Sequence, residues 1–183
     1  GFNPHPKMSA GPPLTFGFTS LAEYLDIHLY RNRETNIPFL LNRKLPDGLK
    51  IENAKTLYGK PDSLNSVINR AEYLIKLNKA FDQSYLNQLI AEYLERTEII
   101  VERQRKKSNQ QLDIKPFVDD IQTDAQSNAL QVSTNIIQGR TVRISEILTS
   151  LLDFTQDEIA LTRVIRTGLF IQFGNASVTP MEI

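Results

Sequence analysis

The sequence contains no cysteine, and this absence excludes several kinds of chemistry. Without thiols the chain can form no disulfide and offers no thiolate nucleophile. It also cannot bind zinc or an iron–sulfur cluster through sulfur. Any iron–sulfur chemistry associated with this chain would therefore have to come from another polypeptide segment.

Histidine is nearly as scarce, since His5 and His28 are the only two. His28 shares a predicted strand face with Asp26, but one strand face supplies at most two metal ligands. We therefore favour a partly exposed strand histidine and predict no metal site.

The usual signatures of enzymes are also missing. There is no glycine-rich phosphate loop, no serine elbow and no cysteine–histidine pair. Adjacent acids occur at Asp119-Asp120 and at Asp157-Glu158, but neighbouring carboxylates in loops usually point apart, whereas acid–base catalysis needs them to converge. An enzyme that acts unaided is thus the hardest function to sustain.

Charge and hydropathy argue against membrane insertion and against binding driven by overall charge, so any charge-driven binding must be local. Lysine plus arginine and aspartate plus glutamate are balanced at 21 each, so no excess charge draws the chain toward nucleic acid or a membrane surface. The longest apolar runs are too short to cross a bilayer, and the start lacks the layout of a signal peptide. We expect a cytoplasmic location and no membrane partner.

The first part of the chain alternates short extended and helical patterns. Four of the nine prolines lie in residues 1–13, which favours an extended, turn-rich segment. Residues 14–18, 23–29 and 49–57 have the alternation of strands. Asn36 is placed to cap a short helix that ends at Pro46-Asp47-Gly48.

The second part has longer elements. Apolar spacing predicts a helix over residues 84–95, with Tyr85 and Tyr93 on its buried face, and a second helix that begins at Thr141 or Ser145. Strands are predicted at 71–77, 98–104, 129–137 and 159–165, and residues 169–173 extend the last strand or form another. Residues 110–127 resemble a long, mobile connection.

This order predicts an α+β fold. From residue 71 it is strand, helix, strand, strand, helix, strand, the split unit of a ferredoxin-like (βαββαβ) fold. Residues 14–57 give the same unit without its first strand and helix. We therefore predict two ferredoxin-like halves: a partial first half in residues 1–70 and a second half in residues 71–183.

Several short motifs point to a known family. The opening segment is Gly1-Phe2-Asn3-Pro4-His5-Pro6-Lys7, followed by Gly11-Pro12-Pro13-Leu14 and by Gly17-Phe18-Thr19-Ser20-Leu21-Ala22-Glu23-Tyr24-Leu25-Asp26-Ile27. Later landmarks in the same order are Leu45-Pro46-Asp47-Gly48-Leu49, Ala71-Glu72-Tyr73, Asp113-Ile114-Lys115-Pro116-Phe117 and Arg166-Thr167-Gly168-Leu169. Over nearly its whole length the chain resembles the radical-SAM-linked domain of unknown function.

The resemblance implies a role and a partner. Members of that family begin with a strand and a basic helix that this sequence does not contain, so we expect an amino-terminally truncated copy. They occur alone or as the C-terminal part of cobalamin-binding radical-SAM proteins. The chain is then an accessory, non-catalytic domain that binds no cofactor itself, while its partner carries the iron–sulfur cluster, S-adenosylmethionine and cobalamin.

Two groups of residues are candidates for contact with a substrate or partner. Asn3, His5 and Lys7 lie in a proline-framed loop that could present an imidazole and an ammonium to a phosphate or carboxylate. The alternative is that the prolines only stiffen a connection.

The second group is basic. Arg103 and Arg105 belong to a run that could meet a nucleic-acid backbone, or that forms a solvated strand end. Arg166 belongs to the last family landmark. We favour substrate recognition or docking beside a radical-SAM enzyme, and the alternative is a free-standing RNA-interaction module, although aromatic residues are not interleaved with the basic run.

Overall fold

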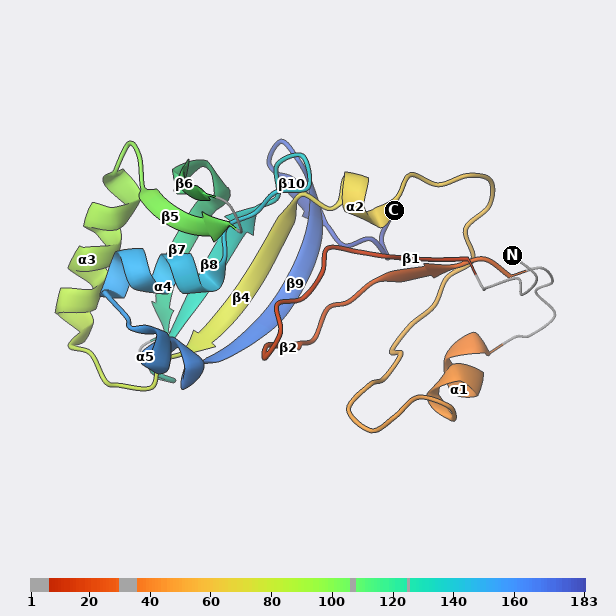
Figure 1. Cartoon of the computed structure of the whole chain (residues 1–183). Coiled ribbons are helices and arrows are strands. Elements are labelled where there is room, and N and C mark those ends of the chain that lie inside the picture. Colours follow the sequence, from red (N-terminus) through yellow and green to blue (C-terminus); the bar gives the residue numbers. More distant parts are fainter. Residues whose placement is uncertain (1–6, 30–35, 106–107, 125) are drawn as a thin grey trace.

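The computed structural model describes residues 7–29, 36–105, 108–124 and 126–183, the side chains of 104, 105 and 108 excepted. Within these ranges the fold mixes α and β structure, with five α-helices, one 3-10 helix and ten strands in three sheets (Figure 1). None of the helices in the described part of the chain has the length and apolar character needed to cross a membrane.

The largest sheet has six strands in the order β10-β9-β4-β8-β7, with β2 beside β9. The strands are β2 (Thr19–Ser20), β4 (Arg70–Lys76), β7 (Val118–Asp124), β8 (Ala129–Asn135), β9 (Arg163–Phe173) and β10 (Ala176–Val178). All neighbours are antiparallel except β2 and β9, which are parallel.

Two helices, α3 (Gln83–Glu95) and α4 (Ile144–Leu152), cover one face of this sheet (Figure 1). In β8, Leu130 and Val132 alternate with polar residues and point to the same core as Ile147 of α4. Tyr93 is buried in that core, as predicted, but Tyr85 is 59% exposed, so its prediction as a core residue was wrong. Each fully buried aliphatic side chain contributes about 1.5–3 kcal/mol.

Residues 110–124 form regular structure and not the long connection that was predicted. They contain most of β6 (Ser108–Asp113), the 3-10 helix η1 (Lys115–Phe117) and all of β7; β6 pairs with β5 (Ile100–Arg105) as a hairpin. Ile114, Phe117 and Ile121 are buried, although polar residues surround them in the sequence. The Asp113 carboxylate accepts hydrogen bonds from the backbone N–H groups of Ile99 (2.8 Å) and Lys115 (3.0 Å). The polar composition of this segment gave no indication of these buried side chains or of the hydrogen bonds of Asp113.

The first part of the chain has less regular structure than predicted. Its elements are β1 (Met8–Ala10), which pairs with β3 (Leu25–Ile27), and the short helices α1 (Ile37–Asn42) and α2 (Leu64–Val67). Residues 14–18 form a turn around Gly17, whose φ is +86°, and residues 49–57 form no strand. Instead, the Asn42 side chain pairs with the backbone N–H and C=O of Ile51 at 2.8 and 2.9 Å.

The predicted strand over residues 159–165 begins later than expected. Helix α5 (Gln156–Ala160) comes first, because Thr155 and Glu158 form a capping box at its start. This Thr-x-x-Glu pattern is a helix signal that was visible in the sequence. Strand β9 then continues through residues 169–173, so this segment extends the last predicted strand and does not form a separate one.

A β-bulge in β9 lies between Val164, which belongs to the main core, and Leu169, which belongs to a smaller second core. Glu72 lies opposite Gly168 and Tyr73 opposite Arg166, so Thr167 is an extra residue in β9. The side-chain alternation is therefore reset. Arg166, Leu169 and Ile171 are all buried. Leu169 and Ile171 belong to a second core cluster with Leu64 and Ile68, around the α2 end of the sheet.

We expect Gly168→Ala to destabilise the fold by about 1–3 kcal/mol, because overpacking at a close contact costs this amount. A Cβ atom at Gly168 would lie 2.2 Å from the ring of Phe170. Thermal unfolding measures the effect. In a Phe170→Ala background the same glycine substitution should cost much less, and an equal cost in both backgrounds would contradict the steric explanation.

Candidate functional site

Residues 7–28, which we call the strap, are bound to the sheet by Arg166. This arginine is 1% exposed. Its Nε donates to Glu23 Oε1 at 3.0 Å, and its Nη1 and Nη2 donate to the carbonyls of Pro13 (3.3 Å) and Pro12 (3.1 Å). A buried guanidinium therefore has a carboxylate and two backbone acceptors, which offset the cost of its desolvation.

Backbone contacts complete the attachment of the strap. Thr19 and Ser20 pair with Ile165 and Arg166, and the N–H of Leu21 donates to the Arg166 carbonyl at 2.9 Å. Tyr73 lies opposite Arg166, and burial raises the pKa of its phenol although the hydrogen bond and charge of Arg166 act in the opposite direction. Side-chain and backbone hydrogen bonds therefore both attach the strap to β9.

The predicted proline-framed loop lies at the start of the strap. Asn3 and His5 fall outside the described residues. Lys7 is exposed, and its carbonyl accepts a hydrogen bond from the His28 N–H at 2.9 Å. Five and six residues further along the chain, the carbonyls of Pro12 and Pro13 accept hydrogen bonds from Arg166. Contact between this loop and a ligand stays a prediction.

Arg103, the first residue of the predicted basic group, has internal partners. Its guanidinium makes two hydrogen bonds to the Glu146 carboxylate, at 2.6 and 2.8 Å, and one to the Thr141 carbonyl at 3.1 Å. This fork joins the β5–β6 hairpin to the start of α4. Arg105 lies in β5, and its side chain is outside what the structure describes.

The fork shifts the pKa of both groups. Burial opposes ionisation of Glu146, but hydrogen bonds from Arg103 and from the Arg143 backbone outweigh it and lower the pKa of this carboxyl. The hydrogen bond to Glu146 in turn raises the pKa of Arg103. Contact of Arg103 or Arg105 with nucleic acid stays a prediction, but Arg103 offers a partner only 19% of its side-chain surface.

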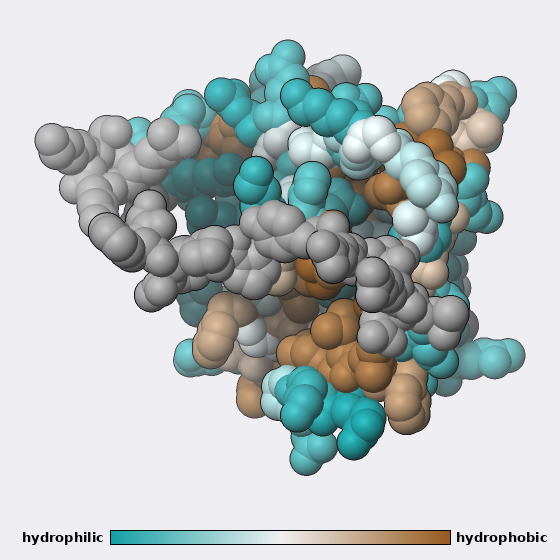
Figure 2. Space-filling view, turned by 90° about the vertical axis from the view of Figure 1, so that its right-hand side faces the viewer, coloured by the Kyte–Doolittle hydropathy of each residue, from teal (hydrophilic) through white to brown (hydrophobic). Residues whose placement is uncertain are grey.

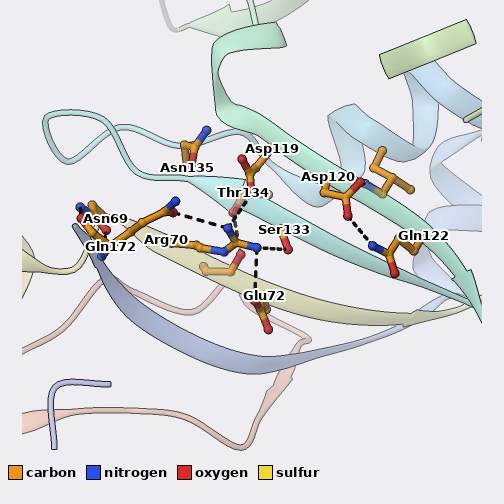
Figure 3. A network of polar contacts seen from close by, with 12 residues as sticks. Asn69, Arg70, Glu72, Asp119, Asp120, Gln122, Ser133, Thr134, Asn135 and Gln172 are labelled. Atoms are coloured by element: carbon orange, nitrogen blue, oxygen red, sulfur yellow. Dashed lines mark hydrogen bonds and ion pairs between the residues drawn. The ribbon is translucent and has the colours of Figure 1, made fainter. Parts of the chain in front are cut away.

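The face of the sheet opposite α3 and α4 carries a polar network that the sequence did not reveal (Figure 3). Arg70 of β4 lies at its centre. Its Nη1 is 2.8 Å from Asp119 Oδ2, and its Nη2 is 3.0 Å from Ser133 Oγ and 3.4 Å from Glu72 Oε1. Gln172 of β9 accepts a further hydrogen bond at 3.4 Å. One guanidinium thereby contacts side chains from four neighbouring strands, β9, β4, β8 and β7.

Asp119 and Asp120, the adjacent acids that the sequence placed in a loop, lie in β7 and have separate partners. Asp119 pairs with Arg70, while Asp120 accepts hydrogen bonds from Gln122 Nε2 at 2.7 Å and from the Ile121 N–H at 2.9 Å. They do not converge on one point. No group of three or more histidine, cysteine, aspartate or glutamate residues in the described ranges could hold a metal ion.

An open cavity of about 420 Å³ lies beside α2. Five of its eight lining residues have a hydroxyl or amide side chain (Ser63, Asn65, Ser66, Asn69 and Gln138), and the other three are Ile68, Ile136 and Gly139. The Asn69 amide already pairs with the backbone N–H and C=O of Gln172 at 2.7 and 3.0 Å. This cavity presents no charged group to a ligand.

The first part of the chain exposes most of the large apolar side chains at the surface. Of seventeen exposed large hydrophobic residues in the described ranges, eleven lie between residues 8 and 58. They are Met8, Phe16, Leu21, Leu25, Ile27, Leu29, Phe39, Leu40, Leu49, Leu57 and Tyr58. Figure 2 views this side of the molecule and shows hydrophobic surface gathered at the level of α1, bordered by hydrophilic surface. A surface of this kind typically marks an interaction site.

Sequence reasoning did not find this surface. Alternation in residues 23–29 identified an apolar strand face, but alternation cannot tell whether another element covers that face. Met8 lies opposite Ile27 and Ala10 opposite Leu25, so these side chains share one face of the β1–β3 pair. Met8 is 61% exposed and Leu25 51%.

Comparison with known proteins gives one match. A family model described as "Uncharacterized protein conserved in bacteria (DUF2344)" matches residues 1–145. Neither the curated proteins nor the solved structures contain a match to the chain.

We expect Glu23→Gln to loosen the strap, because the buried Arg166 guanidinium loses its charged partner. Hydrogen exchange should accelerate at Gly11 and Leu21, whose N–H groups bond to Tyr24 and Arg166, while exchange in α4 changes little. Glu52→Gln, at an exposed pair with Lys50, is the matched control. Unchanged exchange in the strap of the Glu23 variant would contradict this role.

We expect Glu146→Gln to cost about 2 kcal/mol of stability near neutral pH, the scale of a hydrogen-bonded charge that loses its partner. The folded-state pKa of Glu146 is lowered, so its contribution is present above the ordinary carboxyl range and is lost as the pH falls through the folded pKa. Denaturant unfolding from about pH 7 to about pH 3 should show the two proteins converging at the acid end. Glu102→Gln, at an exposed position of β5, should have little effect at any pH, and a difference for Glu146→Gln that persists unchanged in acid would refute the pairing.

Proposed function

The chain belongs to the family described as an uncharacterized protein conserved in bacteria (DUF2344), and from this premise we propose that it is an accessory, non-catalytic docking domain of a radical-SAM system. The resemblance of its opening and later motifs to the radical-SAM-linked domain motivates the choice of system. The chain binds and orients, and its partner performs the chemistry.

The observation that carries the docking role is the exposed apolar surface between residues 8 and 58. Met8, Leu25 and Ile27 share one face of a two-stranded sheet and remain exposed. Leaving such side chains in water costs free energy that a partner surface recovers, at about 25 cal/mol per Å² buried. Arg166 and β9 hold the strap that presents these three side chains, so this part of the surface is preorganised for binding.

The division of chemistry follows from residue types. The chain has no cysteine, so in this proposal the partner supplies the iron–sulfur cluster together with S-adenosylmethionine and cobalamin. Residues of the strap, with the predicted loop of Asn3, His5 and Lys7 at its start, would contact the substrate or the partner.

We also propose that residues 71–183 form a ferredoxin-like unit. The order β9-β4-β8-β7, with α3 before β7 and α4 before β9, supports this assignment. The β5–β6 hairpin would then be an insertion between α3 and β7. The assignment of residues 1–70 to a partial first ferredoxin-like half stays a prediction.

RNA interaction is the weaker candidate. In RNA-binding domains of this general architecture, aromatic residues on the sheet face stack with bases. On the open face here, among the described residues, β4 and β8 carry Arg70, Glu72, Leu74, Gln131 and Ser133, and β9 adds one aromatic side chain, the half-buried Phe170 opposite Arg70. One ring is fewer than the two or three that such domains stack with bases, and Arg70 with its partners Glu72 and Asp119 carries a net charge of 1 − 2 = −1, which does not favour a phosphate backbone.

Copurification with the radical-SAM protein of the same bacterium tests the docking role. We expect a stoichiometric complex in size-exclusion chromatography, and Leu25→Ser should weaken it about tenfold, which corresponds to about 1.4 kcal/mol. Leu161→Ser is the matched control, because Leu161 is an exposed leucine (75%) outside residues 8–58. If the two proteins stay separate while RNA binds with steep salt dependence, the RNA candidate replaces the proposal.

A further inference from the structure

Residues 36–60, which we call the α1 lobe, comprise α1 and the chain that runs from it toward α2, and polar contacts join residues 36–51 to one another. The Asn36 side chain caps α1 by accepting from the Phe39 N–H at 3.1 Å. The Asn42 amide joins the end of α1 to Ile51. No residue of α1 is buried, and in Figure 1 the helix lies apart from the large sheet.

The lobe exposes five large apolar side chains that the described part of the chain covers only in part. Phe39 is 58% exposed, Leu49 62% and Tyr58 92%, and Leu40 (39%) and Leu57 (45%) add to them. Three of the five are aliphatic. A helix without a buried face gains little stability by itself, since short helices depend on packing.

The lobe is also basic, although the whole chain has zero net charge. Five cations (Arg43, Lys44, Lys50, Lys55, Lys60) face two anions (Asp47, Glu52) in residues 36–60, which gives 5 − 2 = +3. Lys50 pairs with Glu52 at 2.9 Å, and Lys55 donates to an oxygen of Ile183. Lys44 and Lys60 make no ion pair within the described ranges.

We propose that the α1 lobe is the docking site for an acidic, amphipathic protein segment, whose apolar face covers the leucines and phenylalanine and whose carboxylates meet Lys44 and Lys60. This inference rests on the proposed docking function and names the chemistry of the partner surface. Complementary charge around an apolar centre gives both orientation and a faster encounter.

Two other occupants fit the lobe less well. Single-stranded nucleic acid is bound through stacked aromatic rings, but most of the exposed apolar side chains here are aliphatic, and Arg43 lies over the Phe39 ring at 5.9 Å. A second copy that used the same lobe across a two-fold axis would bring like charges together. An acidic, amphipathic protein segment provides apolar side chains to cover the leucines and carboxylates to pair with the lysines.

Binding of a defined probe to the full chain tests the inference. The probe is a fluorescent 18-residue peptide with leucine at helical i, i+3, i+4 and i+7 spacing and glutamate on its other face. We expect it to bind at least about tenfold tighter than the analogue with lysine in place of glutamate or a shuffled sequence, and to weaken as salt screens the charges. Fluorescence anisotropy gives the dissociation constants.

Matched variants locate the site. Lys44→Glu with Lys60→Glu should weaken binding of the acidic peptide about tenfold, and Leu49→Ser with Leu57→Ser should do the same. Arg163→Glu, at an exposed cation outside the lobe, should leave it unchanged. All replaced side chains are exposed, so thermal unfolding should show that each variant remains folded.

Three results would overturn the inference: equal binding of the acidic and shuffled peptides, tighter binding of a 12-nucleotide oligouridine, or self-association that the lysine variants abolish. The outcomes also separate it from the docking role. If the radical-SAM protein binds wild type and lobe variants equally, the lobe inference fails and the docking role stands. If the peptide binds through the lobe but the radical-SAM protein does not bind, only the choice of partner fails.

Discussion

Thr167 is the extra residue that β9 inserts opposite β4, and it turns Arg166 and Leu169 toward the same buried face. Without this bulge the strict alternation of a strand would send one of the two to the opposite face. Arg166 then reaches Glu23 and the Pro12 carbonyl, and Leu169 closes the small core around Ile68. The position of the strap, and of the apolar side chains it carries, depends on this one irregularity.

Patterns within a dozen residues were sufficient to predict part of the fold. The helical spacing around Leu86 and Ile90 and the alternation around Leu130 located α3 and β8, because each element buries its own apolar stripe. The same reasoning failed for residues 49–57 and 110–127. In the first, apolar residues alternate but have no neighbouring strand; in the second, the polar residues that suggested a connection include Asp113, which anchors the backbone.

Prediction of the candidate site was limited by distance along the chain. Arg166 was named from a motif, but its partner Glu23 lies 143 residues away, and no local pattern reports such a pair. Arg70 and Asp119 were missed for the same reason. Exposure is equally non-local: Leu25 and Leu130 occupy similar alternating patterns, yet one is half exposed and the other fully buried. The packing of the whole molecule decides which leucine becomes an interaction surface.

The parallel pairing of β2 with β9 has a consequence for biosynthesis. Thr19 leaves the ribosome long before Ile165, its partner in the sheet, has been translated. At about 5–20 residues per second, the 146 intervening positions (165 − 19) take on the order of 7–30 s. During that interval Phe18 and Tyr24, which pack against the two cores in the folded protein, have no sheet to lie against, so the nascent chain exposes apolar side chains that the finished fold partly covers.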